Sequence, residues 1–288
     1  MSVIVVGVDG SQSSQQAVRW AAQEAAWRGC ALKVLFAAGQ TRGSGPHLTA
    51  DLSPQATQVT DRVRALVQES HPDLEVGGAP VVGHPAQVLV DESAGAAMVV
   101  VGNRGHGGFH DMLLGSTSLH TAMYAHCPVA VVRGTAAQSG GGELAPVVVG
   151  VDGSQPSQSA VEVAAYEAEL RGVPLTVLHA WPSAADEALG AWALVGPTGV
   201  LDADTVDVAQ EAAAAARTAR PGVDVTARTV RRGPAGALLA ASKQACLVVV
   251  GCRGHGGFTG LLLGSVSQAL VHHAACPVLV DHWHEPAS

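Results

Sequence analysis

Basic residues are scarce in this sequence. Its 288 positions hold 16 Lys and Arg against 24 Asp and Glu, which gives a formal net charge of −8 at pH 7. Proteins that bind DNA, RNA or anionic lipid regardless of sequence depend on clustered Lys and Arg. We therefore expect neither a nucleic-acid polymer nor a membrane as partner.

Long apolar runs and paired cysteines are also lacking. No apolar run reaches the roughly 18 residues of a membrane span. The first residues, MSVIVVGVDGS, have no basic segment and are typical of a first strand, not of a signal peptide. The five cysteines include no CxxC pair, which argues against a zinc site or a disulfide framework. These absences predict a cytoplasmic protein with reduced thiols.

The two halves of the sequence repeat each other. Residues 4–11, IVVGVDGS, return as VVVGVDGS at 147–154. Residues 99–118 return at 248–267, where only five of the twenty positions differ. A repeat of this kind indicates duplicated structural units. The glycine-rich segment between them is typical of a linker, so we predict domains at 1–135 and 145–288.

Each half alternates short β-branched runs with longer amphipathic stretches, which is typical of βαβ units. With only 3% aromatic residues, the core is expected to consist of Val, Leu and Ala. The strand candidates are almost continuously apolar, as in sheets covered on both faces. The predicted fold class is α/β, with two tandem open parallel five-stranded sheets and helices on both faces. Expected strands are near 3–8, 31–37, 74–82, 98–102 and 128–133, then 147–151, 174–180, 223–231, 246–250 and 277–281. Expected helices are near 13–28, 55–70, 85–96 and 116–126, then 156–171, 204–219, 235–245 and 265–275.

A glycine loop follows the fourth predicted strand of each half and leads into the last helix. Ligands of open parallel sheets bind beyond the carboxyl ends of the strands. Glycines allow close backbone approach, and a helix start offers free N–H groups and a positive dipole end, which favour phosphate. Arg104 and Arg253 are suited to bidentate phosphate contacts.

Named phosphate motifs mostly fail to match these loops. GxxxxGK[ST] is absent and no GxGxxG follows a first strand, so a P-loop NTPase and a dinucleotide-binding domain are disfavoured. The loops instead follow the pattern G-x2-G-x9-G-[ST], at Gly102, Gly105 and Gly115-Ser116, and again at Gly251, Gly254 and Gly264-Ser265.

On this motif the chain resembles the universal stress protein family, specifically its tandem-domain ATP-binding members. The VGVDGS strand ends, the turns at 83–85 and 233–235, and the CPV segments at 127–129 and 276–278 extend the resemblance over almost the whole chain. It implies a Rossmann-like fold of the adenine nucleotide α-hydrolase type, ATP as ligand, Mg²⁺ as an optional companion of the phosphates, and a nucleotide-dependent regulatory role in the stress response.

The resemblance also implies roles for particular residues. Asp9 and Asp152 would face the ribose or, indirectly, a phosphate-bound Mg²⁺. Ala37 and Ala180 would offer backbone to adenine, and Gly83 and Gly233 would shape the ribose side. The expected binding residues of the first half are Gly7, Asp9, Ser11, Ala37, Gly83, Gly102, Arg104, Gly105, Gly115, Ser116 and Ser118. Those of the second half are Gly150, Asp152, Ser154, Ala180, Gly233, Gly251, Arg253, Gly254, Gly264, Ser265 and Ser267. The family pairs its domains through the last strands, so 128–133 and 277–281 are expected to meet, and a homodimer is a further option.

Other interpretations stay open at this point. A slow Mg-dependent ATPase or phosphotransferase would need little more than positioned phosphates, although no catalytic pair is apparent. The glycine loops could be purely structural in a ligand-free scaffold, and Asp9 and Asp152 could cap the following helices. His106 and His255 are interpreted as orienting the loops.

Overall fold

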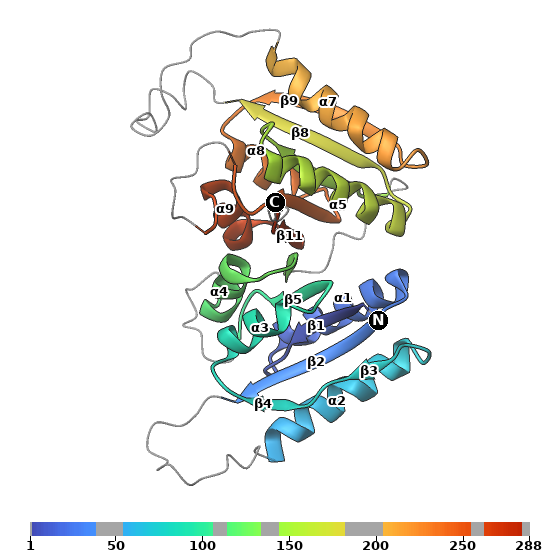
Figure 1. Ribbon diagram of the computed structural model, residues 1–288, viewed down its shortest axis with the longest axis vertical. Coiled ribbons are helices and arrows are strands. Elements are labelled where there is room, and N and C mark those ends of the chain that lie inside the picture. The colour runs from blue at the N-terminus through green and yellow to red at the C-terminus, as the bar shows by residue number, and fades with distance from the viewer. Residues whose placement is uncertain are drawn as a thin grey trace, which may run out of the picture. The chain divides into compact units, whose positions relative to one another are not determined.

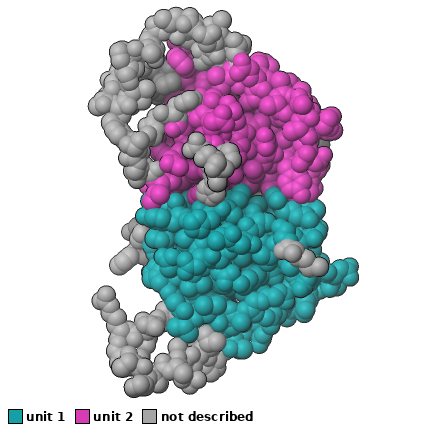
Figure 2. Space-filling view, in the orientation of Figure 1, with its two compact units in different colours: residues 1–133 teal, residues 134–288 magenta. Residues whose placement is uncertain are grey.

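The computed structural model describes residues 2–38, 54–105, 114–133, 144–181, 204–254 and 262–283. The chain forms two compact units, Met1–Arg133 and Gly134–Ser288, which are coloured separately in Figure 2. Each unit is an α/β domain with its own sheet, and each is described by itself below.

The first unit is built on a parallel sheet. Its strands are β1 (Val3–Gly7), β2 (Ala31–Ala38), β3 (Val76–Gly77), β4 (Pro80–Val82), β5 (Met98–Gly102) and β6 (Val129–Val132). The order is β3-β2-β1-β5-β6, and β4 also pairs with β2. The order reverses direction between β1 and β5, and such a switch point opens a crevice at the carboxyl ends of the strands.

Helices cover both faces of this sheet (Figure 1). Helices α1 (Gln12–Arg28) and α2 (Pro54–Ser70) pack together on one face, while α3 (Pro85–Ser93) and α4 (Ser116–Tyr124) pack together on the other. Strands β5 and β6 are buried along their whole length, which explains their continuous run of Val. None of the described helices is both long and apolar enough to cross a lipid bilayer.

The second unit repeats this arrangement. Its elements are β7 (Val147–Val151), α5 (Gln155–Arg171), β8 (Leu175–Trp181), α7 (Asp204–Ala219), β9 (Val225–Arg231), α8 (Pro234–Ala241), β10 (Leu247–Gly251), α9 (Ser265–His273) and β11 (Val278–Asp281). The strand order is β9-β8-β7-β10-β11, with every pair parallel. The buried apolar residues of both units are mostly Val, Ala and Leu. The predicted α/β fold is therefore confirmed.

One predicted strand of the first unit is divided. The sequence pattern indicated a single strand near 74–82, whereas the structure has β3 and β4 with Gly78 between them. Gly78 has φ = 113°, a conformation that side chains rarely adopt, and a Cβ atom there would overlap the carbonyl oxygen of Val34. The close approach of the β2 backbone at a glycine explains the break.

Replacing Gly78 by alanine is expected to destabilise the protein by about 2 kcal/mol, because the positive φ and the overlap with Val34 act together. Urea unfolding followed by circular dichroism measures the loss. Gly77→Ala is the matched control, since nothing lies within 4 Å of a Cβ atom there. Equal stabilities of the two variants would contradict the explanation of the break.

Candidate functional site

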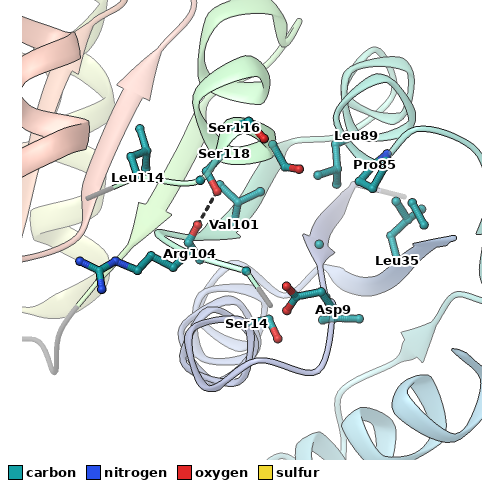
Figure 3. Close-up of a pocket in the computed structure, with 17 residues that line it drawn as sticks. Asp9, Ser14, Leu35, Pro85, Leu89, Val101, Arg104, Leu114, Ser116 and Ser118 are labelled. Carbon is teal, nitrogen blue, oxygen red and sulfur yellow. Dashed lines mark hydrogen bonds between the residues drawn. The ribbon is translucent and has the colours of Figure 1, made fainter. Parts of the chain in front are cut away.

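A cavity of about 440 Å³ lies at the carboxyl ends of β1, β2 and β5 in the first unit (Figure 3). This volume is within the range of roughly 300–1,000 Å³ of small-molecule pockets. The cavity is lined by strand ends, by the first turns of α3 and α4, and by the glycine loop between β5 and α4. The lining residues are Gly7, Val8, Asp9, Ser14, Leu35, Ala37, Pro85, Leu89, Val101, Gly102, Arg104, Gly105, Leu114, Gly115, Ser116, Thr117 and Ser118.

One end of the cavity is apolar. Leu35 from β2 and Pro85 and Leu89 from α3 lie close together in Figure 3. Leu89 packs against the backbone of Gly7, where an added Cβ atom would stand 3.1 Å from its side chain. A flat apolar group is the natural occupant of such a surface, because burying it removes apolar area from water. The sequence alone did not identify these three residues. Their only sequence signal is position: Leu35 lies toward the end of β2, and Pro85 and Leu89 lie in the first turns of α3.

The opposite end of the cavity is formed by the start of α4. The amide of Gly115 donates to Asn103 O at 2.8 Å, and the amide of Leu119 donates to Gly115 O at 3.0 Å. Between them, the amides of Ser116–Ser118 have no acceptor in the part of the chain that the structure describes, and Gly115 provides no side-chain cap. Three free amides at the positive end of a helix dipole favour an anion at this point.

Ser118 connects the glycine loop to this helix. Its side chain is buried, and its hydroxyl donates to the carbonyl oxygen of Gly102 at 2.6 Å. Ser267 makes the same bond to Gly251 at 2.7 Å. The hydroxyl protons of both serines are therefore committed within the protein, whereas the exposed Ser116 and Ser265 make no side-chain hydrogen bond to another described residue.

Asp9 lies across the cavity from α4. Its Oδ1 accepts from the amide of Ser11 at 2.9 Å, while the Ser11 hydroxyl caps α1 by accepting from Ser14 N at 3.1 Å. The cap of α1 is therefore Ser11, not Asp9. The other oxygen, Oδ2, faces the glycine loop, since a Cβ atom on Gly105 would stand 2.5 Å from it. Asp9 is thus held at the cavity wall with one oxygen directed at the loop.

Arg104 contributes mainly its backbone to the loop geometry. Its amide donates to Ser13 Oγ at 3.2 Å, and its carbonyl oxygen accepts from Ser11 Oγ at 3.4 Å. In Figure 3 the guanidinium extends away from Pro85 and Leu89. The expected bidentate contact would therefore be made at the rim of the cavity.

The second unit brings together the equivalent residues. Leu178 pairs with Gly150 as Leu35 pairs with Gly7, and Leu238 packs against Gly150. Asp152 accepts from Ser154 N at 3.0 Å and from Ser154 Oγ at 2.6 Å. A Cβ atom on Gly254 would overlap the Asp152 carboxylate, as in the first unit. The remaining equivalents are Ala180, Gly251, Arg253, Gly264, Ser265 and Ser267.

Gly83 and Gly233 are not equivalent positions. Val82 pairs with Ala38 in the first unit, and Arg231 pairs with Trp181 in the second. The next helices begin at Pro85 and Pro234. Gly83 therefore corresponds to Arg232, and Gly233 corresponds to the helix cap His84. The two turns have the same length, and the two glycines stand at successive positions within them. Neither Gly83 nor Ser11 lines the cavity.

Cys252 lies in the second glycine loop, whereas Cys127 precedes β6 at the amino edge of the first sheet. Burial raises the pKa of Cys252 although Arg253 opposes the shift, and burial raises the pKa of Cys127 to about 12. Both are therefore thiols and not thiolates near neutral pH, and neither supplies a nucleophile.

Within the described ranges, no group of three or more His, Cys, Asp or Glu side chains is placed to hold a metal ion. His106 and His255, interpreted above as orienting the loops, lie outside the described residues.

Comparison with known proteins gives matches over the whole chain. A family model described as the Universal stress protein family matches residues 1–133 and again 144–282. A universal stress protein of Mycolicibacterium smegmatis is 39% identical over 288 residues, covering 96% of both chains. The crystal structure of a universal stress protein from Archaeoglobus fulgidus is similar at a TM-score of 0.68 and 20% identity, covering 99% of this chain and 97% of that one. A universal stress protein solved in complex with cAMP matches 46% of this chain and 97% of its own, at 27% identity and a TM-score of 0.39.

Proposed function

This chain belongs to the universal stress protein family, and we propose that each unit binds one ATP-like adenine nucleotide and that the protein acts as a nucleotide-dependent regulator in the stress response. The observation that carries the proposal is the cavity of the first unit, which joins an apolar slot to a helix start with three free amides. The second unit has the equivalent strand ends, glycines and helix start, with Val266 in place of Thr117.

The two ends of the cavity suit the two ends of a nucleotide. The phosphates would accept hydrogen bonds from the amides of Ser116–Ser118, where the helix dipole favours negative charge. Adenine would lie against Leu35 and Leu89, with the Ala37 backbone at its edge. Asp9 stands between these ends, where its carboxylate can accept hydrogen bonds from ribose hydroxyls.

Magnesium fits the site only as a companion of the phosphates. Mg²⁺ is commonly held by one or two carboxylates together with substrate phosphates and water. Asp9 and Asp152 each supply one carboxylate beside a glycine loop, with one oxygen already accepting from a backbone amide. When bound, the ion would neutralise part of the triphosphate charge.

A regulatory role agrees better with the cavity than turnover does. Among the described residues that line it, Asp9 is the only carboxylate and none is a histidine. General acid–base catalysis needs a group within hydrogen-bond reach of the proton that is transferred. Binding without chemistry requires only the amides and the apolar slot.

Nucleotide occupancy is tested directly on protein purified without added nucleotide. We expect denaturation to release adenine nucleotide, detected by chromatography, and calorimetry of the stripped protein to show ATP binding. Protein that is empty and also gives no binding heat with ATP would overturn the proposal. Phosphate release is measured in parallel with Mg²⁺. Steady turnover that is lost in the variant Asp9→Asn with Asp152→Asn would favour the ATPase alternative.

A further inference from the structure

The two units differ along the strand that neighbours β2 in the first and β8 in the second. Val230 of β9 pairs with Ala180 as Val81 of β4 pairs with Ala37, so the strands can be compared residue by residue. Side chains two residues apart share a face of a strand. Arg228 therefore lies on the face of Val230, beside Leu178, and Arg232 follows the last residue of β9, where its amide donates to Val230 O at 3.2 Å. The first unit has Ala79 and Gly83 at these places.

A second residue difference between the units makes room for the Arg232 side chain. In the first unit a Cβ atom on Gly83 would stand 2.7 Å from Cγ2 of Val88. Ala237 occupies the position of Val88 in the second unit, which removes that obstacle. The Arg232 side chain runs along the first turn of α8, where its Nε stands 3.2 Å from the place of a Cβ atom on Gly236. This turn begins at Pro234, the counterpart of the cavity residue Pro85.

The charge at this edge is not neutralised within the described part of the chain. Arg228 and Arg232 are exposed, and no carboxylate pairs with either of them there. In the first turn of α9, Val266 stands where α4 has Thr117, so the second unit has one hydroxyl fewer at this helix start. Compared with the first unit, the second unit therefore attracts an anion more strongly on the β9 side and has one hydrogen-bond donor fewer at the start of α9.

We propose that the second unit selects adenine nucleotides that carry an additional phosphate on the ribose, at the 2′ or 3′ position, whereas the first unit does not. The inference rests on the proposed function, which places the 5′ phosphates at the helix start and the ribose between Asp152 and α8. A ribose phosphate would then meet Arg232, with Arg228 nearby. Guanidinium groups suit phosphate because they donate two parallel hydrogen bonds.

The experiment uses full-length variants in which one site is closed. Ser116→Asp places a carboxylate at the phosphate position of the first unit, and Ser265→Asp does the same in the second. Calorimetry then compares AMP, adenosine 3′,5′-bisphosphate and adenosine 2′,5′-bisphosphate, with inorganic phosphate as a control. In the Ser116→Asp variant we expect one of the two bisphosphates to bind at least about tenfold more tightly than AMP. The preferred isomer identifies the position of the additional phosphate on the ribose. With Ser265→Asp we expect no such preference.

Matched variants assign the preference to Arg232. Arg232→Gly recreates the first-unit residue and should abolish the preference while AMP affinity changes little. The pair Gly83→Arg and Val88→Ala should create the preference in the first unit. Equal binding of AMP and both bisphosphates by the Ser116→Asp protein would overturn this inference alone. Absence of binding by every nucleotide in unaltered protein would overturn the proposed function with it.

Discussion

Replacing Ser116 and Ser265 together by aspartate is expected to weaken ATP binding by about 100-fold or more without loss of fold. Each new carboxylate would stand at the first position of α4 or α9, where the helix dipole stabilises it by about 0.3–1 kcal/mol. It would occupy the phosphate position, and juxtaposed like charges cost several kcal/mol. Calorimetry measures the affinity, and thermal unfolding measures the stability.

The matched control replaces the same two serines by alanine. This change removes only the hydroxyls and keeps the amides, so we expect a loss of a few-fold, in line with about 1 kcal/mol for one hydrogen bond. ATP affinity that is unchanged in the aspartate variant would show that the phosphates are not bound at these helix starts.

Replacing Arg171 by methionine is expected to reduce the free energy of unfolding by about 3–5 kcal/mol. Glu167 is fully buried and forms an ion pair with Arg171, whose side chain is only 7% exposed. Removing the guanidinium leaves a buried carboxylate without its countercharge, which is costly because the charged form is poorly solvated there. Chemical denaturation followed by circular dichroism measures the change.

Two further variants separate charge from packing. Glu167→Leu combined with Arg171→Met removes both charges and should recover most of the lost stability. Arg28→Met breaks the equivalent pair with Glu24, and a smaller loss is expected because Arg28 is 16% exposed. A double variant no more stable than Arg171→Met alone would refute the electrostatic explanation.

Most of the fold could be predicted from sequence because its signals are local and duplicated. The apolar strand runs and the amphipathic stretches give the elements nearly where the structure has them. In the structure Ser11 caps the start of α1 and Gly29 its end, and both are residue types that commonly stand at these positions. The division of the third strand could not be predicted, because it depends on how closely Val34 approaches Gly78 in space.

Part of the cavity lining was expected from the family resemblance, which pointed to Gly7, Asp9 and Ala37, and part from a single segment. The glycine loop and the start of α4 are contiguous, so their meeting at one place follows from the motif. The apolar slot joins Leu35 to Pro85 and Leu89, which are about 50 residues apart in sequence, and only the strand order brings them together. The different positions of Gly83 and Gly233 in their turns could not be read from the motif either, because strand register decides which residues correspond.

A crystal structure of the protein with ATP tests the central claim most directly. We predict a nucleotide in the cavity of the first unit, with phosphate oxygens within hydrogen-bond distance of the Ser116 and Thr117 amides and adenine against Leu35 and Leu89. ATP bound elsewhere, or a cavity without nucleotide at saturating ATP, would contradict the account.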